Sequence, residues 1–242
     1  MTKKNIKLLI LLPIFLIAEL CLWYCILFET SGKTLRVCCF SSIVLACVFA
    51  LCFIRIKSLT LLLNAGLILT VCADYFLVLP NSLTYTYQMI GTSFFVAVQI
   101  CYFLFLLLET KSKKQRIIHG IVRACAVLIA LTALFIVLKK DTDALSVISL
   151  FYIANLITNA GFAFAQGKRG ILFGIGLVLF ACCDLCVGMQ VALGTYLPIS
   201  ETSWLYQLLH GDFNFIWFFY LPSQTILAIA LAKYNGYFQR NK

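Results

Sequence analysis

Long runs of apolar residues, separated by short polar loops, fill almost the whole of this 242-residue chain. An α-helix needs roughly 20 apolar residues to cross the hydrocarbon core of a bilayer, and each run is near that length. The runs are continuous and do not alternate with a period of two, which argues against a membrane β-barrel. The pattern therefore predicts eight membrane-spanning helices, at about residues 7–28, 35–54, 59–79, 86–108, 117–138, 145–165, 170–193 and 213–232.

The composition supports this interpretation and adds a limit on domain number. Hydrophobic residues make up 63% of the chain and charged residues only 12%, which is too little polar surface for a water-soluble domain of this size. The apolar runs leave no room for a second domain, so we expect residues 1–242 to form a single transmembrane domain, an all-α eight-helix bundle. We further expect an integral protein of a bacterial plasma membrane. The longest loop, residues 194–212, is predicted to contain a short amphipathic segment on the outer surface.

The distribution of basic residues predicts the orientation. The formal net charge is +10, but fourteen of the nineteen Lys and Arg residues fall at one side of the predicted membrane. Lys and Arg are enriched in cytoplasmic loops, so this asymmetry places both termini in the cytoplasm. The positive charge is thereby explained by topology, and we expect no nucleic-acid partner.

The twelve cysteines lie mostly inside apolar runs, without the paired loop spacing of a disulfide framework. Cys182 and Cys183, beside Asp184, do not have the ligand spacing of a zinc site. We interpret the cysteines as small packing residues and expect no metal.

Two matched stretches carry an acid into the predicted membrane. GLILTVCAD at residues 66–74 and GLVLFACCD at residues 176–184 agree at six of nine positions, counting one Ile-to-Val replacement. Both helices run from the basic side, which puts Asp74 and Asp184 roughly 22–26 Å along a core about 30 Å thick. An acid at such depth is expensive to bury and usually functional. The repeat suggests two parallel four-helix halves, with the two aspartates at one shared site.

Other polar residues lie nearer the middle of the predicted spans. Several recur at helical spacing on one face, which turns them toward protein or a water-filled cavity. One interpretation is that they bind substrate; the alternative is that they form interhelical hydrogen bonds that only pack the bundle. The candidates for substrate binding are Glu19, Gln99, Tyr102, Asn155, Tyr220 and Gln224.

A pair of buried carboxyl groups suits acid–base chemistry. One can remain protonated and donate a proton while the other activates a water, which is hydrolysis without a covalent intermediate. Ser93 and Ser223 lack the context of a hydrolase nucleophile, and no nucleotide-binding fingerprint is present. We therefore expect Asp74 and Asp184 to be the catalytic residues, with no cofactor.

At these residues the chain resembles the YhhN family of eight-span membrane proteins, which includes lysoplasmalogenases. The stretch GLILTVCADYFLVL is similar to the family's first aspartate helix, and LVLFACCDLCVG to its second. GTSFFVAVQICY is similar to its Gly-x3-Phe-x3-His-x2-Tyr helix, and YLPSQTILA to its Tyr-x3-Gln ending. The matches run in the family's order over about two-thirds of the chain.

The resemblance implies cleavage of the vinyl ether of a lysoplasmalogen, giving a fatty aldehyde and a glycerophospho-alcohol. Asp74 and Asp184 would be acid and base, and the tyrosines and glutamines would orient water and the head group of a lysophospholipid-like substrate. Gln99 departs from the pattern, since the family has histidine there, and glutamine does not titrate near neutral pH. The resemblance is thus to a divergent member of the family. Two alternatives stay open: a proton-coupled transporter of a small molecule or lipid, and a non-catalytic member of the family.

Overall fold

All regular structure in the described part of the chain is helical. The computed structural model describes residues 3–28, 32–54, 58–138, 142–195, 203–210 and 213–237. Eight helices in these ranges are long and apolar enough to cross a membrane, which confirms the predicted eight-span bundle. The helices are α1 (Lys3–Phe28), α2 (Gly32–Leu51), α3 (Ser58–Leu77), α4 (Tyr85–Glu109), α5 (Lys113–Leu138), α6 (Ala144–Ala165), α7 (Ile171–Thr195) and α9 (Phe215–Tyr237), with a 3-10 turn η2 (Gly167–Arg169) and a short α8 (Trp204–His210).

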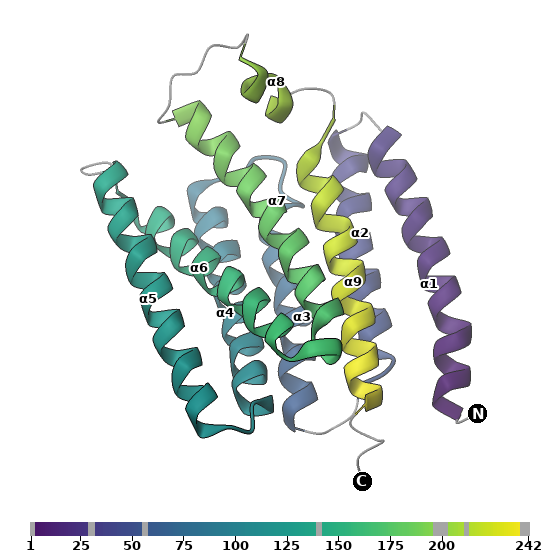
Figure 1. Ribbon diagram of the computed structural model, residues 1–242. Helices are drawn as coiled ribbons and strands as arrows, with labels where there is room; N and C mark the ends of the chain where they lie inside the picture. Colours follow the sequence, from purple (N-terminus) through teal and green to yellow (C-terminus); the bar gives the residue numbers. More distant parts are fainter. Residues whose placement is uncertain are drawn as a thin grey trace.

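The bundle has a buried centre and two peripheral helices (Figure 1). The packed pairs α3–α4 and α7–α9 lie at the centre, α6 bridges α4 and α7, and α2 packs on both α3 and α9. Helix α1 packs mainly on α2, and α5 mainly on α6, so both leave a wide apolar face uncovered, as a lipid-facing helix does.

Basic residues gather at one end of the bundle, where α1 begins and α9 ends (Figure 1). The α4–α5 connection, the η2 turn and the last turns of α9 all lie there; we call this the basic end. They contribute Lys111, Lys113, Lys114, Arg116, Lys168, Arg169 and Lys233. The charge asymmetry expected from the sequence is therefore present at these connections, and its assignment to the cytoplasm stays a prediction.

Two glycines let the central helices approach closely. A Cβ on Gly66 of α3 would lie 2.3 Å from Tyr102 Cε1 of α4, and a Cβ on Gly176 of α7 would lie 2.8 Å from Leu227 Cδ2 of α9. Small residues at helix interfaces are the usual means of close packing in membranes. Gly66 and Gly176 occupy the same position of the two matched stretches, and each lies where its helix meets a neighbour, Gly66 against α4 and Gly176 against α9.

The helix boundaries follow local chemistry. Helix α6 is capped by Asp143, whose Oδ1 accepts from the Ser146 backbone N–H at 2.8 Å. Hydrogen bonds from the Ser146 side chain and backbone hold the Asp143 pKa below its ordinary value. Helix α5 begins at Lys113, earlier than the span predicted from residue 117. Its first turn is polar and precedes the apolar run from which the span was predicted. A short helix, α8, lies within residues 194–212, with Trp204 exposed, and its position on the outer membrane surface stays a prediction.

Candidate functional site

Each of the two membrane aspartates is hydrogen-bonded by a tyrosine from a different helix. Tyr220 Oη of α9 donates to Asp74 Oδ2 of α3 at 2.5 Å, across 146 residues of sequence. Tyr152 Oη of α6 donates to Asp184 Oδ2 of α7. From the basic-end starts of α3 and α7, a rise of 1.5 Å per residue puts Asp74 and Asp184 roughly 24 and 20 Å along the bundle. Four helices therefore converge on one polar cluster in the half of the bundle remote from the basic end.

The two aspartate–tyrosine pairs belong to a single site. Asp74 and Asp184 interact electrostatically, and Tyr152 interacts with both carboxyl groups. Phe180, one turn before Asp184, lies between the two tyrosines, with its ring centroid 6.2 Å from that of Tyr152 and 5.3 Å from that of Tyr220. The structure thus brings together the two aspartates that the sequence placed at equal depth.

The two carboxyl groups differ in exposure. Asp74 is 2% exposed, whereas Asp184 is only partly buried. Two carboxyl groups held close together in unequal environments are the arrangement that divides acid and base roles between them. The arrangement fits general acid–base catalysis, with one carboxyl group as the acid and the other as the base.

A second polar cluster lies on α6, on the basic-end side of Tyr152. Arg123 of α5 donates from Nη1 to Asn155 Oδ1, and from Nη2 to Asn159 Oδ1 at 2.6 Å. Asn159 Nδ2 in turn donates to Gln99 Oε1 of α4 at 2.9 Å. Since Tyr152, Asn155 and Asn159 share one face of α6, that helix connects this cluster to the aspartates.

The remaining predicted binding residues lie elsewhere in the bundle. Tyr102 is fully buried against Gly66 and Phe173, with its ring centroid 5.1 Å from that of Phe173. Gln224 donates from Nε2 to the neighbouring Ser223 Oγ at 3.3 Å. Glu19 accepts from Ser42 Oγ at 2.5 Å and from Trp23 Nε1 at 3.1 Å, which ties α1 to α2. Substrate binding by these residues stays a prediction, and in each case the contacts shown are those of helix packing.

Sequence reasoning did not assign site roles to Tyr152 and Arg123. Tyr152 was visible as part of the stripe with Asn155 and Asn159, yet nothing in α6 alone indicates that it meets Asp184. Arg123 carries a stronger signal, because it lies ten residues into α5, too far from the helix start to be a surface anchor.

The residues present do not form an obvious metal centre. Within the described ranges no cluster of three or more His, Cys, Asp or Glu side chains has metal-binding geometry, and the twelve cysteines are unpaired.

Comparison with known proteins identifies the family and nothing narrower. No curated protein matches the chain, and no solved structure does. The family model described as the YhhN family matches residues 36–231. That range includes both aspartates, both tyrosines and the Arg123 cluster, and it spans most of the eight-helix bundle. The chain belongs to the YhhN family.

Proposed function

We propose that this protein hydrolyses the vinyl ether bond of a lysoplasmalogen, giving a fatty aldehyde and a glycerophospho-alcohol. The observation that carries the proposal is the aspartate pair, whose two carboxyl groups are close, unequally exposed and each held by a tyrosine. Membership of a family that includes lysoplasmalogenases supports it. The eight spans make the chain an integral membrane protein, so a bilayer lipid can reach the bundle sideways.

The reaction needs one acid and one base. The acid protonates the vinyl carbon remote from the ether oxygen, which leaves an oxocarbenium ion at the carbon bonded to that oxygen. A water adds to this carbon as the base takes its proton, and the resulting hemiacetal collapses to aldehyde and alcohol. The leaving alkoxide oxygen takes up the proton that the hemiacetal hydroxyl loses, so the sum is addition of one water.

The exposures of the two carboxyl groups suggest their roles. Asp74, the more deeply buried carboxyl group, is the proposed acid that protonates the vinyl carbon, and Asp184 is the proposed base that takes a proton from the water. Tyr220 and Tyr152 each donate a hydrogen bond to one carboxyl group and so restrict its orientation.

The buried cation Arg123 weighs against the alternative of a proton or cation carrier. It lies between the basic end and the aspartates on the polar face of α6, where a fixed positive charge opposes the passage of cations. A hydrolase acting on a phosphate-bearing lipid has no such conflict.

The proposal is tested by fatty aldehyde release from a lysoplasmalogen by purified protein in detergent micelles. Asp74→Asn and Asp184→Asn should each lower the rate by about 10²–10⁴-fold, the usual loss on removing a general acid or base. Asp143→Asn, which changes an acid outside the membrane spans, is the matched control and should retain the wild-type rate. Undiminished hydrolysis in both Asp74→Asn and Asp184→Asn would contradict the acid–base mechanism. A wild type that cleaves no ether lipid, yet moves protons into liposomes, would replace hydrolysis with transport.

A further inference from the structure

Arg123 is a buried cation without a buried acid. Its side chain is 8% exposed, and a rise of 1.5 Å per residue puts it ~15 Å from the start of α5 at the basic end. Its two hydrogen-bond partners are the side-chain oxygens of Asn155 and Asn159, both neutral. Among the residues that the structure describes, no carboxylate lies within ion-pair distance of its guanidinium.

The guanidinium also has unused binding capacity. It carries five N–H donors, and Nε, although buried, has no hydrogen-bond partner. The Phe103 ring covers one face, with its centroid 4.1 Å from Cζ. Amide oxygens orient the guanidinium without neutralising it, so the full charge remains in a low-dielectric region. An uncompensated charge there is costly, and a bound anion would remove that cost.

The position of Arg123 fits one part of the substrate. Tyr152, which holds Asp184, and Asn155 and Asn159, which hold Arg123, lie on the same face of α6. Three to seven residues separate them, or about 4.5–10.5 Å along the helix. In a lysoplasmalogen the phosphate and the vinyl ether are attached to opposite ends of one glycerol. A phosphate bound at Arg123 would therefore allow the vinyl ether to reach the aspartates.

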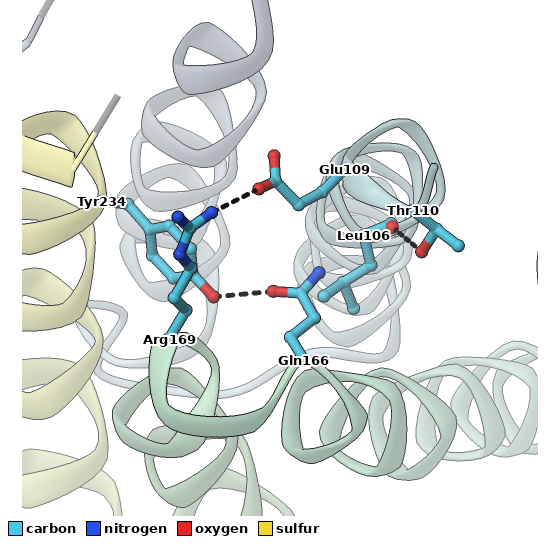
Figure 2. A network of polar contacts seen from close by, with 6 residues as sticks. All are labelled: Leu106, Glu109, Thr110, Gln166, Arg169 and Tyr234. Atoms are coloured by element: carbon cyan, nitrogen blue, oxygen red, sulfur yellow. Dashed lines mark hydrogen bonds and ion pairs between the residues drawn. The ribbon is translucent and has the colours of Figure 1, made fainter. Parts of the chain in front are cut away.

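The basic end offers a polar approach to Arg123. A cavity of about 390 Å³ opens there between α4, α5 and the end of α6, bordered by Glu109, Lys111, His119, Gln166 and Arg169. Figure 2 shows its rim, where Arg169 Nη1 lies 3.8 Å from Glu109 Oε1, and Tyr234 Oη donates to Gln166 Oε1 at 2.8 Å.

The inner wall of this cavity lies next to Arg123. His119, one helical turn from Arg123, stacks on Phe162 with ring centroids 3.5 Å apart. His119 Nδ1 and Gln166 Nε2 are buried without partners. Polar and cationic groups therefore continue from the basic end to within one turn of Arg123.

We infer that Arg123 binds the phosphate of a lysophospholipid substrate, with the head group toward the basic end and the vinyl ether at the aspartates. The inference rests on the proposed function and assigns to Arg123 the recognition of the phosphate, so that the protein prefers a lysoplasmalogen to a neutral alkenylglycerol. The free N–H groups of Arg123 and the absence of a competing acid favour an oxyanion with several acceptor oxygens.

Two lipids with the same alkenyl chain test this preference, a 1-alkenyl-glycerophosphoethanolamine and a 1-alkenylglycerol. In Arg123→Gln, kcat/KM for the phospholipid should fall about 10–100-fold more than kcat/KM for the alkenylglycerol, the loss expected for charge-assisted hydrogen bonds. Arg123→Lys retains the charge but not the planar guanidinium. Its loss of kcat/KM on the phospholipid, relative to the alkenylglycerol, should therefore lie between those of wild type and Arg123→Gln. Arg116→Gln removes an exposed arginine from the same helix and should leave the ratio of the two constants unaltered.

An equal loss on both lipids in Arg123→Gln would overturn the inference and make Arg123 a packing residue. Thermal unfolding of each variant identifies misfolding; if the glutamine variant does not fold, the lysine variant carries the same comparison. An equal loss of kcat/KM on both lipids in Arg123→Lys would then contradict the inference.

A binding arm separates failure of this inference from failure of the proposed function. A saturated 1-O-alkyl lysophosphoethanolamine has no vinyl ether to cleave, and its binding to wild type and variants is measured by isothermal titration calorimetry. Weaker binding to Arg123→Gln than to wild type supports the phosphate site even if the wild type hydrolyses nothing. Equal binding to both overturns the site whether or not hydrolysis is observed. Competition by glycerophosphoethanolamine as strong as by the alkyl lipid would show a site for the water-soluble phosphate ester, and not for the lipid.

Discussion

Replacing Gly66 by alanine should force α3 away from α4 and displace Asp74. The new methyl carbon would lie 2.3 Å from Tyr102 Cε1, whereas carbon atoms in contact rest about 3.5–4.0 Å apart, so more than about 1 Å of movement is required. Tyr102 has no room to yield, because it is fully buried and packs edge-on against Phe173. Overpacking of this kind costs about 1–3 kcal/mol of unfolding free energy.

The activity should fall by more than the stability loss alone explains. Asp74 lies on the same helix eight residues beyond Gly66, and a misplacement of about 1 Å in a catalytic group can lower a rate about 10²-fold. Unfolding in detergent and aldehyde release measure the two effects. Gly161→Ala in α6 is the control, because its methyl group would meet no atom within 4 Å.

A double-mutant cycle decides whether the Tyr102 ring is the cause. In a Tyr102→Ala background the clashing ring is gone, so Gly66→Ala should cost less than about 0.5 kcal/mol. The same cost in both backgrounds would refute the packing argument. So would equal unfolding free energies for Gly66→Ala and the Gly161→Ala control.

Three further changes test separate contacts. Tyr220→Phe removes the hydrogen bond to Asp74 and should lower kcat/KM about 10-fold or more, whereas Tyr75→Phe, exposed beside Asp74, should not; equal rates in the two variants would contradict the role of the phenol. Glu19→Ala should cost about 1–3 kcal/mol in an unfolding assay by breaking the α1–α2 tie, and a raised KM without that loss would instead favour substrate binding. Asp143→Ala should cost about 0.5–2 kcal/mol at neutral pH through loss of the α6 N-cap. Since the folded-state pKa of Asp143 is lowered, the stabilisation is fully present above the ordinary value of 3.8 and is lost only as pH falls through the lowered pKa. Asp143→Asn keeps an accepting oxygen and should remove this pH dependence; a wild type and an asparagine variant that respond alike to acid would contradict it.

The eight-helix bundle was predictable because a bilayer requires long apolar segments, and each segment is visible in the sequence by itself. The pairing of Asp74 with Asp184 was indicated by a local repeat and by equal depth. Their tyrosine partners were not, because Tyr220 and Tyr152 meet the aspartates through the packing of α9 on α3 and of α6 on α7. No pattern within one helix contains that information.

Residues on one predicted stripe also separate in the structure. Gln99 and Tyr102 lie three residues apart on α4, yet Gln99 meets Asn159 of α6, whereas Tyr102 fills the space beside Gly66 of α3. Helical spacing predicts which side chains leave the lipid, but which neighbouring helix each one meets depends on the order of helices around the bundle.

The bond between Tyr220 and Asp74 has a consequence for biosynthesis. Asp74 enters the membrane with the third span, and its partner is synthesised 146 residues later, on the last. During that interval the nascent chain holds an intramembrane carboxyl group without its tyrosine partner, so the aspartate site forms only when the final helix has docked. Docking of α9 thus completes the Asp74–Tyr220 contact, and defects in docking should yield inserted protein that lacks the proposed activity.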